Sequence, residues 1–244
     1  MRDVNKKVNC GVLYGVGIGP GDPELLTLKA QMILRSVPVI FAPKADSESS
    51  SIAAEIIKSH IPNKRKIKQL VFPMTRDRKI LRAFWEQAAA MVYKVLSSGK
   101  DAAFITLGDP FIYSTYSYLL TAIKKLDKDV TTVTIPGISS INAASSLLEI
   151  PLVEANEKCL IMPLPKNFAE IKKALALVDS LVILKIGKNL DKLLKFLKRE
   201  KLNKTSYFVQ RIGLPGQHIT KDISLLSDTA SGYLSMMIIK WVPQ

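Results

Sequence analysis

The 244-residue sequence is poor in the residues that most often bind metal ions. It contains two cysteines and two histidines. Cys10 and Cys159 lack the spacing of a zinc-binding motif, and His60 and His218 lie far apart along the chain. Structural zinc sites need closely spaced cysteine and histidine ligands, so no metal site is expected.

A long apolar run is also absent. A membrane-spanning helix needs about 18 consecutive apolar residues, and no segment reaches that length. Residues 1–9 are polar and do not form the apolar core of a secretion signal. We therefore expect a cytoplasmic protein without a membrane partner.

Acidic residues are scarce relative to basic ones. The chain has 35 Lys and Arg against 21 Asp and Glu, a formal net charge of +14. Such an excess indicates an anionic partner, which could be nucleic acid, an acidic membrane surface or a substrate with several carboxylates. Lysines on solvated helix faces are the plainer alternative, and composition does not decide between them.

The common nucleotide-binding motifs are missing as well. A dinucleotide fingerprint needs G-x-G-x-x-G, but the sixth position is Pro20 counting from Gly15 and Asp22 counting from Gly17. Lys44 stands where an acidic residue would hold a ribose, and no Walker A lysine follows the glycines. These absences argue against nicotinamide enzymes, common Rossmann-type methyltransferases and P-loop nucleotidases.

Three glycine- and proline-containing turns are present instead. Each follows a strand-like apolar run, and they span residues 17–22, 108–113 and 136–140. Helical patterns separate these runs, so the strands are expected to be parallel and their carboxyl ends to share one sheet edge. Small molecules bind at such edges in α/β proteins. Ordinary strand-to-helix turns are the alternative.

The two halves of the chain differ in pattern. The first half predicts strands at 10–16, 38–43, 66–72, 104–107 and 129–135, and helices at 23–34, 52–59, 81–98 and 112–120. The second half predicts strands at 158–162, 180–185, 206–211 and 234–240, with helices at 168–177 and 190–197. We expect an N-terminal α/β domain at 1–137 with a mostly parallel, doubly wound sheet, and a smaller C-terminal α/β domain at 138–244 with a mixed sheet.

The turns together resemble the tetrapyrrole (corrin/porphyrin) methylase family. The resemblance rests on Gly15-x-Gly-x-Gly-Pro-Gly-Asp-Pro, Leu107-Gly-Asp-Pro-Phe-Ile-Tyr113 and Ile135-Pro-Gly-Ile-Ser139, in that order along the chain. Each motif is weak alone, whereas the three together are specific. Residues 71–78 and 106–116 are most similar to the branch that methylates carbon 20 of precorrin-2 or cobalt-factor II in cobalamin biosynthesis.

The resemblance implies a homodimer of two-domain subunits with S-adenosylmethionine folded into the cleft between the domains. The cofactor contacts it implies are Pro20, Leu107, Gly108, Asp109, Ile112, Ser139, Ser140, Ile186 and Ile212. Many of them would act through the main chain. Gln210-Arg211 stands where relatives often carry Glu-Arg, and the high lysine content has no role in the family pattern.

The tetrapyrrole substrate carries acetate and propionate groups that need cationic partners. Lys44, Arg76 and Arg78 are the candidates, because they follow strand-like runs where carboxylates could be bound. Alternatively, Asp77 pairs with the two arginines or caps the next helix. No residue is assigned as a catalytic base, since a sulfonium already activates its methyl group.

Two other functions remain possible from the sequence. A methyltransferase of the same superfamily acting on ribosomal RNA would suit the positive charge, although the sequence contains no recognisable RNA-binding module. A non-catalytic basic protein that binds nucleic acid is the second alternative. The intact turns at Pro20, at Gly108-Asp109-Pro110 and at Pro136-Gly137 argue against such a decayed site.

Overall fold

The computed structural model describes residues 10–61, 66–202, 205–226 and 230–240, so the polar segment 1–9 lies outside it. The chain forms two compact units, Met1–Ser139 and Ser140–Gln244. The domain boundary between 137 and 138 stays a prediction.

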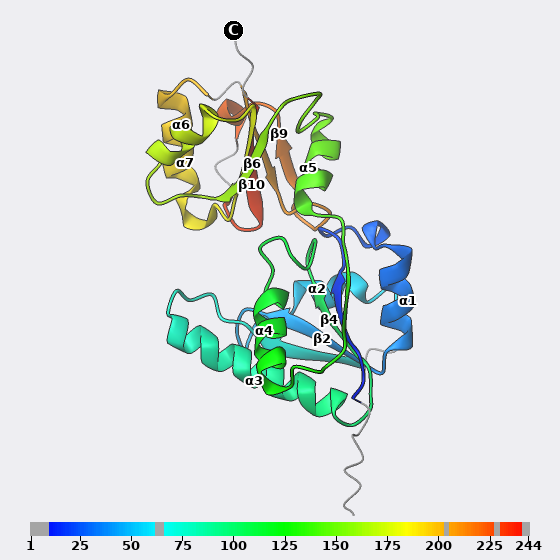
Figure 1. Ribbon diagram of the computed structural model, residues 1–244. Coiled ribbons are helices and arrows are strands. Elements are labelled where there is room, and N and C mark those ends of the chain that lie inside the picture. Colours follow the sequence, from blue (N-terminus) through cyan, green and yellow to red (C-terminus); the bar gives the residue numbers. More distant parts are fainter. Residues whose placement is uncertain (1–9, 62–65, 203–204, 227–229, 241–244) are drawn as a thin grey trace, which may run out of the picture. The chain divides into compact units, whose positions relative to one another are not determined.

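The first unit alternates strands and helices (Figure 1). Its described elements are β1 (Leu13–Gly17), the short 3-10 helix η1 (Pro23–Leu25), α1 (Leu28–Ser36), β2 (Val39–Lys44), α2 (Ile52–Ile57), β3 (Ile67–Val71), α3 (Arg78–Leu96), β4 (Ala102–Thr106), α4 (Tyr116–Leu126) and β5 (Thr132–Ile135). The five strands pair in the order β3-β2-β4-β1-β5, and every pairing is parallel. The predicted parallel sheet is confirmed.

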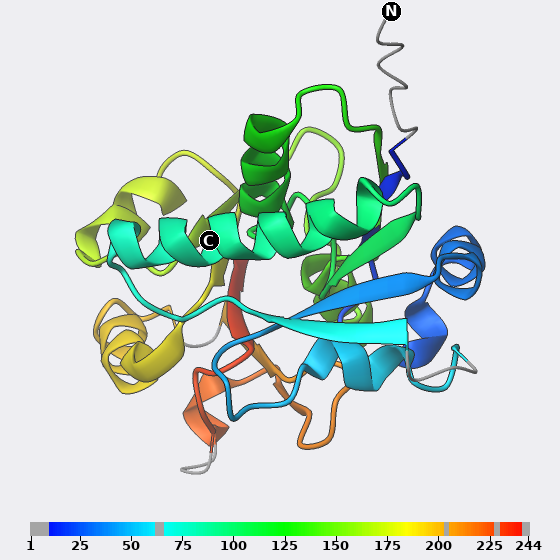
Figure 2. The ribbon, with the colours of Figure 1, turned by 90° about the horizontal axis from the view of Figure 1, so that it is seen from below.

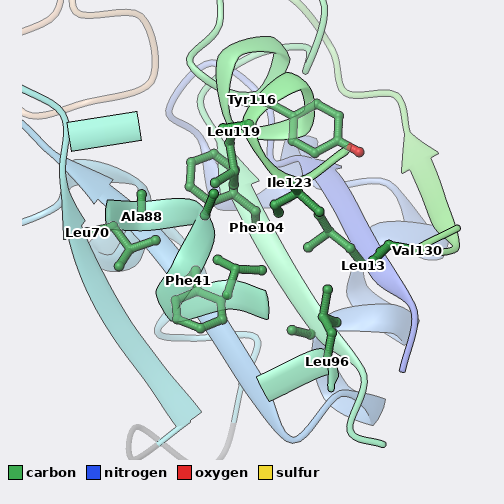
Figure 3. Packing of buried hydrophobic residues seen from close by; sticks show 14 of the residues in the cluster. Leu13, Phe41, Leu70, Ala88, Leu96, Phe104, Tyr116, Leu119, Ile123 and Val130 are labelled. Carbon is green, nitrogen blue, oxygen red and sulfur yellow. The ribbon is translucent and has the colours of Figure 1, made fainter. Parts of the chain in front are cut away.

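Helices cover both faces of this sheet. Figure 2 shows α3 and α4 on one side of it and α2 on the other. The core on the α3 and α4 side contains Phe41, Phe104, Tyr116 and Leu119, all fully buried (Figure 3). Central strand β4 is buried along its whole length, which is why its sequence is continuously apolar rather than alternating.

Two predicted helices begin elsewhere than their spacing indicates. The segment expected as one helix from Pro23 to Leu34 is η1, capped by Asp22, followed by α1, capped by Thr27. The chain is extended at Leu26 and Thr27, and the Thr27 side chain accepts the amide hydrogen of Ala30. An N-cap inside an apolar pattern thus divides the helix.

The helix after β4 begins at Tyr116 rather than at Ile112. Tyr113 has a φ of 52°, which no α-helix accommodates, and the Ser114 hydroxyl accepts the amide hydrogen of Tyr116 at 3.1 Å. The apolar residues from 111 to 113 therefore belong to the loop between β4 and α4.

The second unit contains a mixed sheet. Its described elements are α5 (Ser140–Leu148), β6 (Cys159–Pro163), α6 (Ala169–Leu175), β7 (Ser180–Leu184), the 3-10 helix η3 (Gly187–Asn189), α7 (Leu190–Arg199), β8 (Ser206–Gln210), β9 (His218–Thr220), the 3-10 helix η5 (Ile223–Leu225) and β10 (Ser235–Lys240). The strand order is β6-β7-β10-β8-β9, with β6 and β7 parallel and the other pairs antiparallel. The mixed sheet is confirmed, and β9 and α5 add to the predicted strands and helices.

Both faces of this second sheet are also covered. Helices α6 and α7 pack on the face that carries Leu181, Ile183 and Phe208, and α5 packs on the opposite face (Figure 1). Lys192 and Lys195 of α7 face solvent, as expected for an amphipathic helix with a basic outer face. Among the described helices, none combines the length and apolarity needed to cross a membrane.

Candidate functional site

The three predicted turns meet at the carboxyl edge of the first sheet. They follow β1, β4 and β5, which are neighbours in the order β4-β1-β5. The turn after β1 and the turn after β4 are bridged directly, since the Gly108 N–H donates to the Gly19 carbonyl oxygen at 2.8 Å. Three segments far apart in sequence therefore form one backbone surface.

The glycines of these turns permit close approach between the loops. A Cβ atom on Gly17 would lie 2.6 Å from the Gly108 oxygen and 2.6 Å from the Gly137 nitrogen. A Cβ atom on Gly137 would lie 2.2 Å from the Gly108 oxygen. Real Cβ contacts are never this short with backbone atoms, so side chains are excluded at both positions.

Gly15 has a different role. A Cβ atom there would lie 2.1 Å from the ring of Tyr116, which is fully buried against β1. The Tyr116 hydroxyl and the Thr134 hydroxyl lie 3.2 Å apart, and burial raises the pKa of this phenol. The first glycine of the motif thus serves core packing rather than a ligand.

Asp109 connects two of the loops. One carboxylate oxygen accepts the Phe111 N–H at 2.9 Å and the other accepts the Gly137 N–H at 3.2 Å. The first bond closes an Asx turn within its own loop, and the second reaches the loop after β5. The half-buried carboxylate is therefore engaged on both oxygens.

A hydroxyl pair, which the sequence interpretation missed, supports the same loop. The Thr106 and Ser114 hydroxyl oxygens lie 2.8 Å apart and link the end of β4 to the residue where the loop turns toward α4. Thr106 is 5 % exposed. The sequence does show a threonine at the end of an otherwise apolar strand. Because a buried hydroxyl needs a hydrogen-bond partner, this threonine could have indicated the pair.

The candidate cations lie at the ends of β2 and β3. The Lys44 ammonium donates to the Ser47 carbonyl oxygen at 2.7 Å, so its own loop positions it. Asp77 accepts the amide hydrogens of Lys79 and Ile80 and caps α3. This geometry matches the capping alternative for Asp77. Arg76 and Arg78 are exposed and form no salt bridge with any other described residue.

The loop that contains Lys44 is held by the carboxylate of Asp46. The Asp46 carboxylate accepts the amide hydrogens of Glu48 and Ser49, the latter at 2.6 Å. These bonds, led by the one from Ser49, lower the pKa of Asp46, and nearby Lys44 lowers it further. The Asp46 carboxylate therefore stays ionised close to Lys44 in this loop.

Large apolar side chains are exposed beside these cations. Met74 after β3 is 78 % exposed, and Phe111 after β4 is 59 % exposed. Ile112 and Tyr113 are also exposed. Because β2 separates β3 from β4, these residues and Lys44 follow three adjacent strands at the same edge.

The remaining predicted contacts lie in the second unit. Ser140 begins α5, while Ile186 and Ile212 follow the ends of β7 and β8 with buried side chains. Because the side chains of Ile186 and Ile212 are buried, these two residues could contact a ligand only through their main chains. Each follows a residue in the left-handed region, Lys185 at φ 56° and Arg211 at φ 52°. Strained backbone of this kind concentrates at functional sites.

Hydrogen bonds fix this edge of the second sheet. The Gly187 N–H donates to the Gly232 oxygen at 2.9 Å, and the Arg211 N–H donates to the Leu234 oxygen at 2.9 Å. The predicted residues thus form two groups. Pro20, Leu107, Gly108, Asp109, Ile112 and Ser139 lie on the three loops of the first unit, and Ser140, Ile186 and Ile212 lie in the second.

One cavity contains none of these residues. It has a volume of about 710 Å³ and is lined in the second unit by, among others, Lys158, Lys172, Asp179 and Glu200. Two of these charged residues, Lys172 and Glu200, pair with each other in a salt bridge at 2.8 Å. We therefore place the candidate site at the three loops rather than in this cavity.

The loops suit a ligand recognised mainly through hydrogen bonds to backbone. Gly17 and Gly137 let the loop backbones pack against one another, and Pro20 in the loop after β1 is buried. Such a surface can hold a small molecule that carries its own reactive group. The cations and apolar side chains at β2 and β3 suit a flat anionic molecule.

Comparison with known proteins identifies the family of this chain. Residues 12–224 match the model of the tetrapyrrole (corrin/porphyrin) methylases. A "probable cobalt-precorrin-2 C(20)-methyltransferase" of Methanocaldococcus jannaschii is 39 % identical, with 98 % of each chain covered. A "cobalt-precorrin-2 C(20)-methyltransferase" of Salmonella typhimurium is 28 % identical, with 89 % of this chain and 91 % of the relative covered.

Solved structures share the fold. A cobalamin synthesis related protein, CobF, from Corynebacterium diphtheriae superposes with a TM-score of 0.70 at 19 % identity, covering 95 % of this chain and 98 % of that one. A uroporphyrin-III C-methyltransferase from Thermus thermophilus, complexed with S-adenosylhomocysteine, gives a TM-score of 0.62 at 19 % identity, covering 94 % and 97 %.

Proposed function

The chain belongs to the tetrapyrrole methylase family, and from this premise we propose that it methylates carbon 20 of precorrin-2 or cobalt-factor II in cobalamin biosynthesis, with S-adenosylmethionine as methyl donor. The observation that carries the proposal is the 39 % identity to a C20-methyltransferase over nearly the full length of both chains. The protein is thus an S-adenosylmethionine-dependent methyltransferase.

The residues of the three loops fit the cofactor. Gly17 and Gly137 let the backbones of the three loops pack closely, because a Cβ atom at either position would meet the Gly108 oxygen. We assign cofactor binding to Pro20, Leu107, Gly108, Asp109, Ile112 and Ser139 in the first unit, and to Ser140, Ile186 and Ile212 in the second. When bound, the sulfonium supplies an already activated methyl group.

The protein's part in the reaction is therefore positional. Its residues must hold the accepting carbon in line with the methyl group and exclude water, which lowers the entropic part of the barrier. Loops held by Asp109 and by the Thr106–Ser114 pair are suited to this role because they are fixed at several points. No general base is assigned.

The substrate side of the site follows β2 and β3. We propose that Lys44, Arg76 and Arg78 bind the peripheral carboxylates of the tetrapyrrole. Exposed arginines with no described acidic partner are free to form bidentate bonds with carboxylates. Met74 and Phe111, exposed at the same edge, offer apolar contact to the macrocycle.

The activity is tested by incubating the purified protein with S-adenosylmethionine and either precorrin-2 or cobalt-factor II. Product mass and absorbance should show one added methyl group, and NMR should assign it to carbon 20. Comparison of the two substrates would decide whether cobalt is already present. Absence of methyl transfer to both, with the protein folded, would contradict the proposal.

The arginine assignment makes a separate prediction. Arg76→Ala and Arg78→Ala should each weaken tetrapyrrole binding by about tenfold or more, because each loses a charge-assisted hydrogen bond. Affinity for S-adenosylhomocysteine, measured by calorimetry, should not change. Arg82→Ala is the matched control, since Arg82 lies on the same helix and pairs with Glu86 at 3.5 Å. Unchanged tetrapyrrole affinity in both variants would reject the assignment.

The homodimer implied by the family resemblance and the cytoplasmic location are also proposals. Light scattering after gel filtration tests the first, and a single-subunit mass across the concentration range would reject it. Fractionation of cells that produce the protein tests the second.

A further inference from the structure

We propose that Asp109 is a positioning residue whose carboxylate ties the loop after β4 to the loop after β5. Its side chain thereby sets the spacing of the backbone at the site, and the cofactor contact assigned to Asp109 is made by its main chain. The role of Asp109 in loop spacing follows from the geometry alone. Its consequence for cofactor affinity rests on the proposed function.

The carboxylate engages donors from two loops. The Phe111 N–H lies 2.9 Å from Oδ1 and belongs to the same loop as Asp109. The Gly137 N–H lies 3.2 Å from Oδ2 and belongs to the loop after β5, 28 residues further along the chain. The first bond fixes the orientation of the side chain, and the second uses this orientation to hold a distant segment.

The second bond passes over the end of an intervening strand. Since β1 lies between β4 and β5, a link between their loops must cross the end of β1, where Gly17 stands. This crossing brings the Gly108 oxygen close to Gly17 and Gly137. A Cβ atom added to either glycine would lie within 2.6 Å of that oxygen. Asp109 thus holds together the layer of backbone that requires the two glycines.

A carboxylate is needed for this arrangement. Both neighbours are N–H donors, so both side-chain oxygens must accept. An asparagine has one oxygen and would direct its NH2 group at one of the two donors. Bonds to an ionised acceptor are also stronger than bonds to a neutral one.

The test uses Asp109→Asn and protein labelled with 15N only at its 12 glycines. Without ligand, the Gly137 amide hydrogen should exchange with solvent about tenfold faster in the variant, because it loses its acceptor. S-adenosylhomocysteine should bind about tenfold more weakly by calorimetry. The resonance of Gly99, which lies before β4 at the opposite edge, should not change.

Asp127→Asn is the matched control. Asp127 also accepts an N–H two residues further on, from Asp129 at 2.9 Å, and a distant donor, the Tyr93 hydroxyl at 3.1 Å. It follows α4 and precedes β5, and so lies at the opposite edge of the sheet. This variant should leave both the Gly137 amide and the affinity for S-adenosylhomocysteine unchanged.

Two results with a folded Asp109→Asn variant would overturn the proposal. Weaker binding of S-adenosylhomocysteine with an unchanged Gly137 amide would mean that Asp109 acts on the ligand directly. No change in either quantity would mean that the carboxylate is dispensable. If the wild type bound no S-adenosylhomocysteine while the Gly137 amide behaved as expected, the proposed function would fail and the loop connection would stand.

Asp109→Ser provides a second variant if the asparagine variant does not fold. Its single oxygen can serve the local Phe111 N–H but cannot serve Gly137 as well. Faster exchange at Gly137 is expected again. Failure of both variants to fold, with Asp127→Asn folded, would also overturn the proposal, because Asp109 would then support the whole unit rather than the site loops.

Discussion

At the scale of single residues, glycines that look equivalent in a motif have different neighbours. Gly15 lies beneath the ring of Tyr116, whereas Gly17 lies beneath the backbone of two other loops. The first position therefore contributes to the core and the second to the site. A substitution at Gly15 should change stability before it changes ligand binding.

We predict that Gly15→Ala destabilises the protein by about 1–3 kcal/mol, because the added methyl group overpacks the core against Tyr116. The free energy of unfolding from urea titration measures the effect. The double variant Gly15→Ala, Tyr116→Leu should lose less than the sum of the single variants, since a smaller side chain makes room. Additive losses would contradict the contact.

At the scale of elements, the end of α7 is joined to α6 through one acidic residue. Glu200 accepts hydrogen bonds from Lys172 at 2.8 Å and from Arg199 at 3.1 Å. These bonds, the one from Lys172 first, lower the pKa of Glu200. A carboxyl whose pKa is lower in the folded state stabilises the fold above its unfolded pKa, and this contribution is lost as the pH falls through the folded value.

Glu200→Gln should therefore lower the melting temperature at pH 7 by a small amount. The difference from the wild type should shrink as the pH falls below the usual glutamate pKa, about 4.3, and disappear below the lower folded pKa of Glu200. The effect should also shrink in high salt, because Lys172 is exposed. Glu86→Gln, which removes the exposed pair with Arg82, is the control. A difference that persists at acid pH would contradict this origin.

At the scale of the whole molecule, two units of different sheet type contribute loops with related features. The first unit offers glycine-lined turns after parallel strands, and the second offers left-handed residues at Lys185, Arg211 and Leu234. The excess of positive charge is distributed over both units. The stabilisation of the fold by an added ligand can distinguish an enzyme with a cofactor site from a basic protein that binds nucleic acid.

S-adenosylhomocysteine at one hundred times its dissociation constant should raise the free energy of unfolding by about 2.7 kcal/mol. A structured RNA fragment at physiological salt should produce no increase. Thermal unfolding followed by circular dichroism measures both. Stabilisation by RNA that weakens steeply with salt, without any effect of S-adenosylhomocysteine, would favour the nucleic-acid alternative.

The sequence by itself determined most of the strands and helices, the two sheet types and the three turns, because burial patterns and turn residues are local signals. It did not predict β9 or α5. It also carried the family resemblance. It misplaced the start of α4, since the left-handed Tyr113 leaves no mark in apolar spacing.

Only the tertiary structure decided which residues of the turns touch each other. Local patterns do not specify strand order, and it is the position of β1 between β4 and β5 that brings Gly17 beneath Gly108 and Gly137. The same order lets Asp109 reach Gly137. Contacts between residues distant in sequence depend on how the sheet is assembled, so they emerge only when the whole unit is folded.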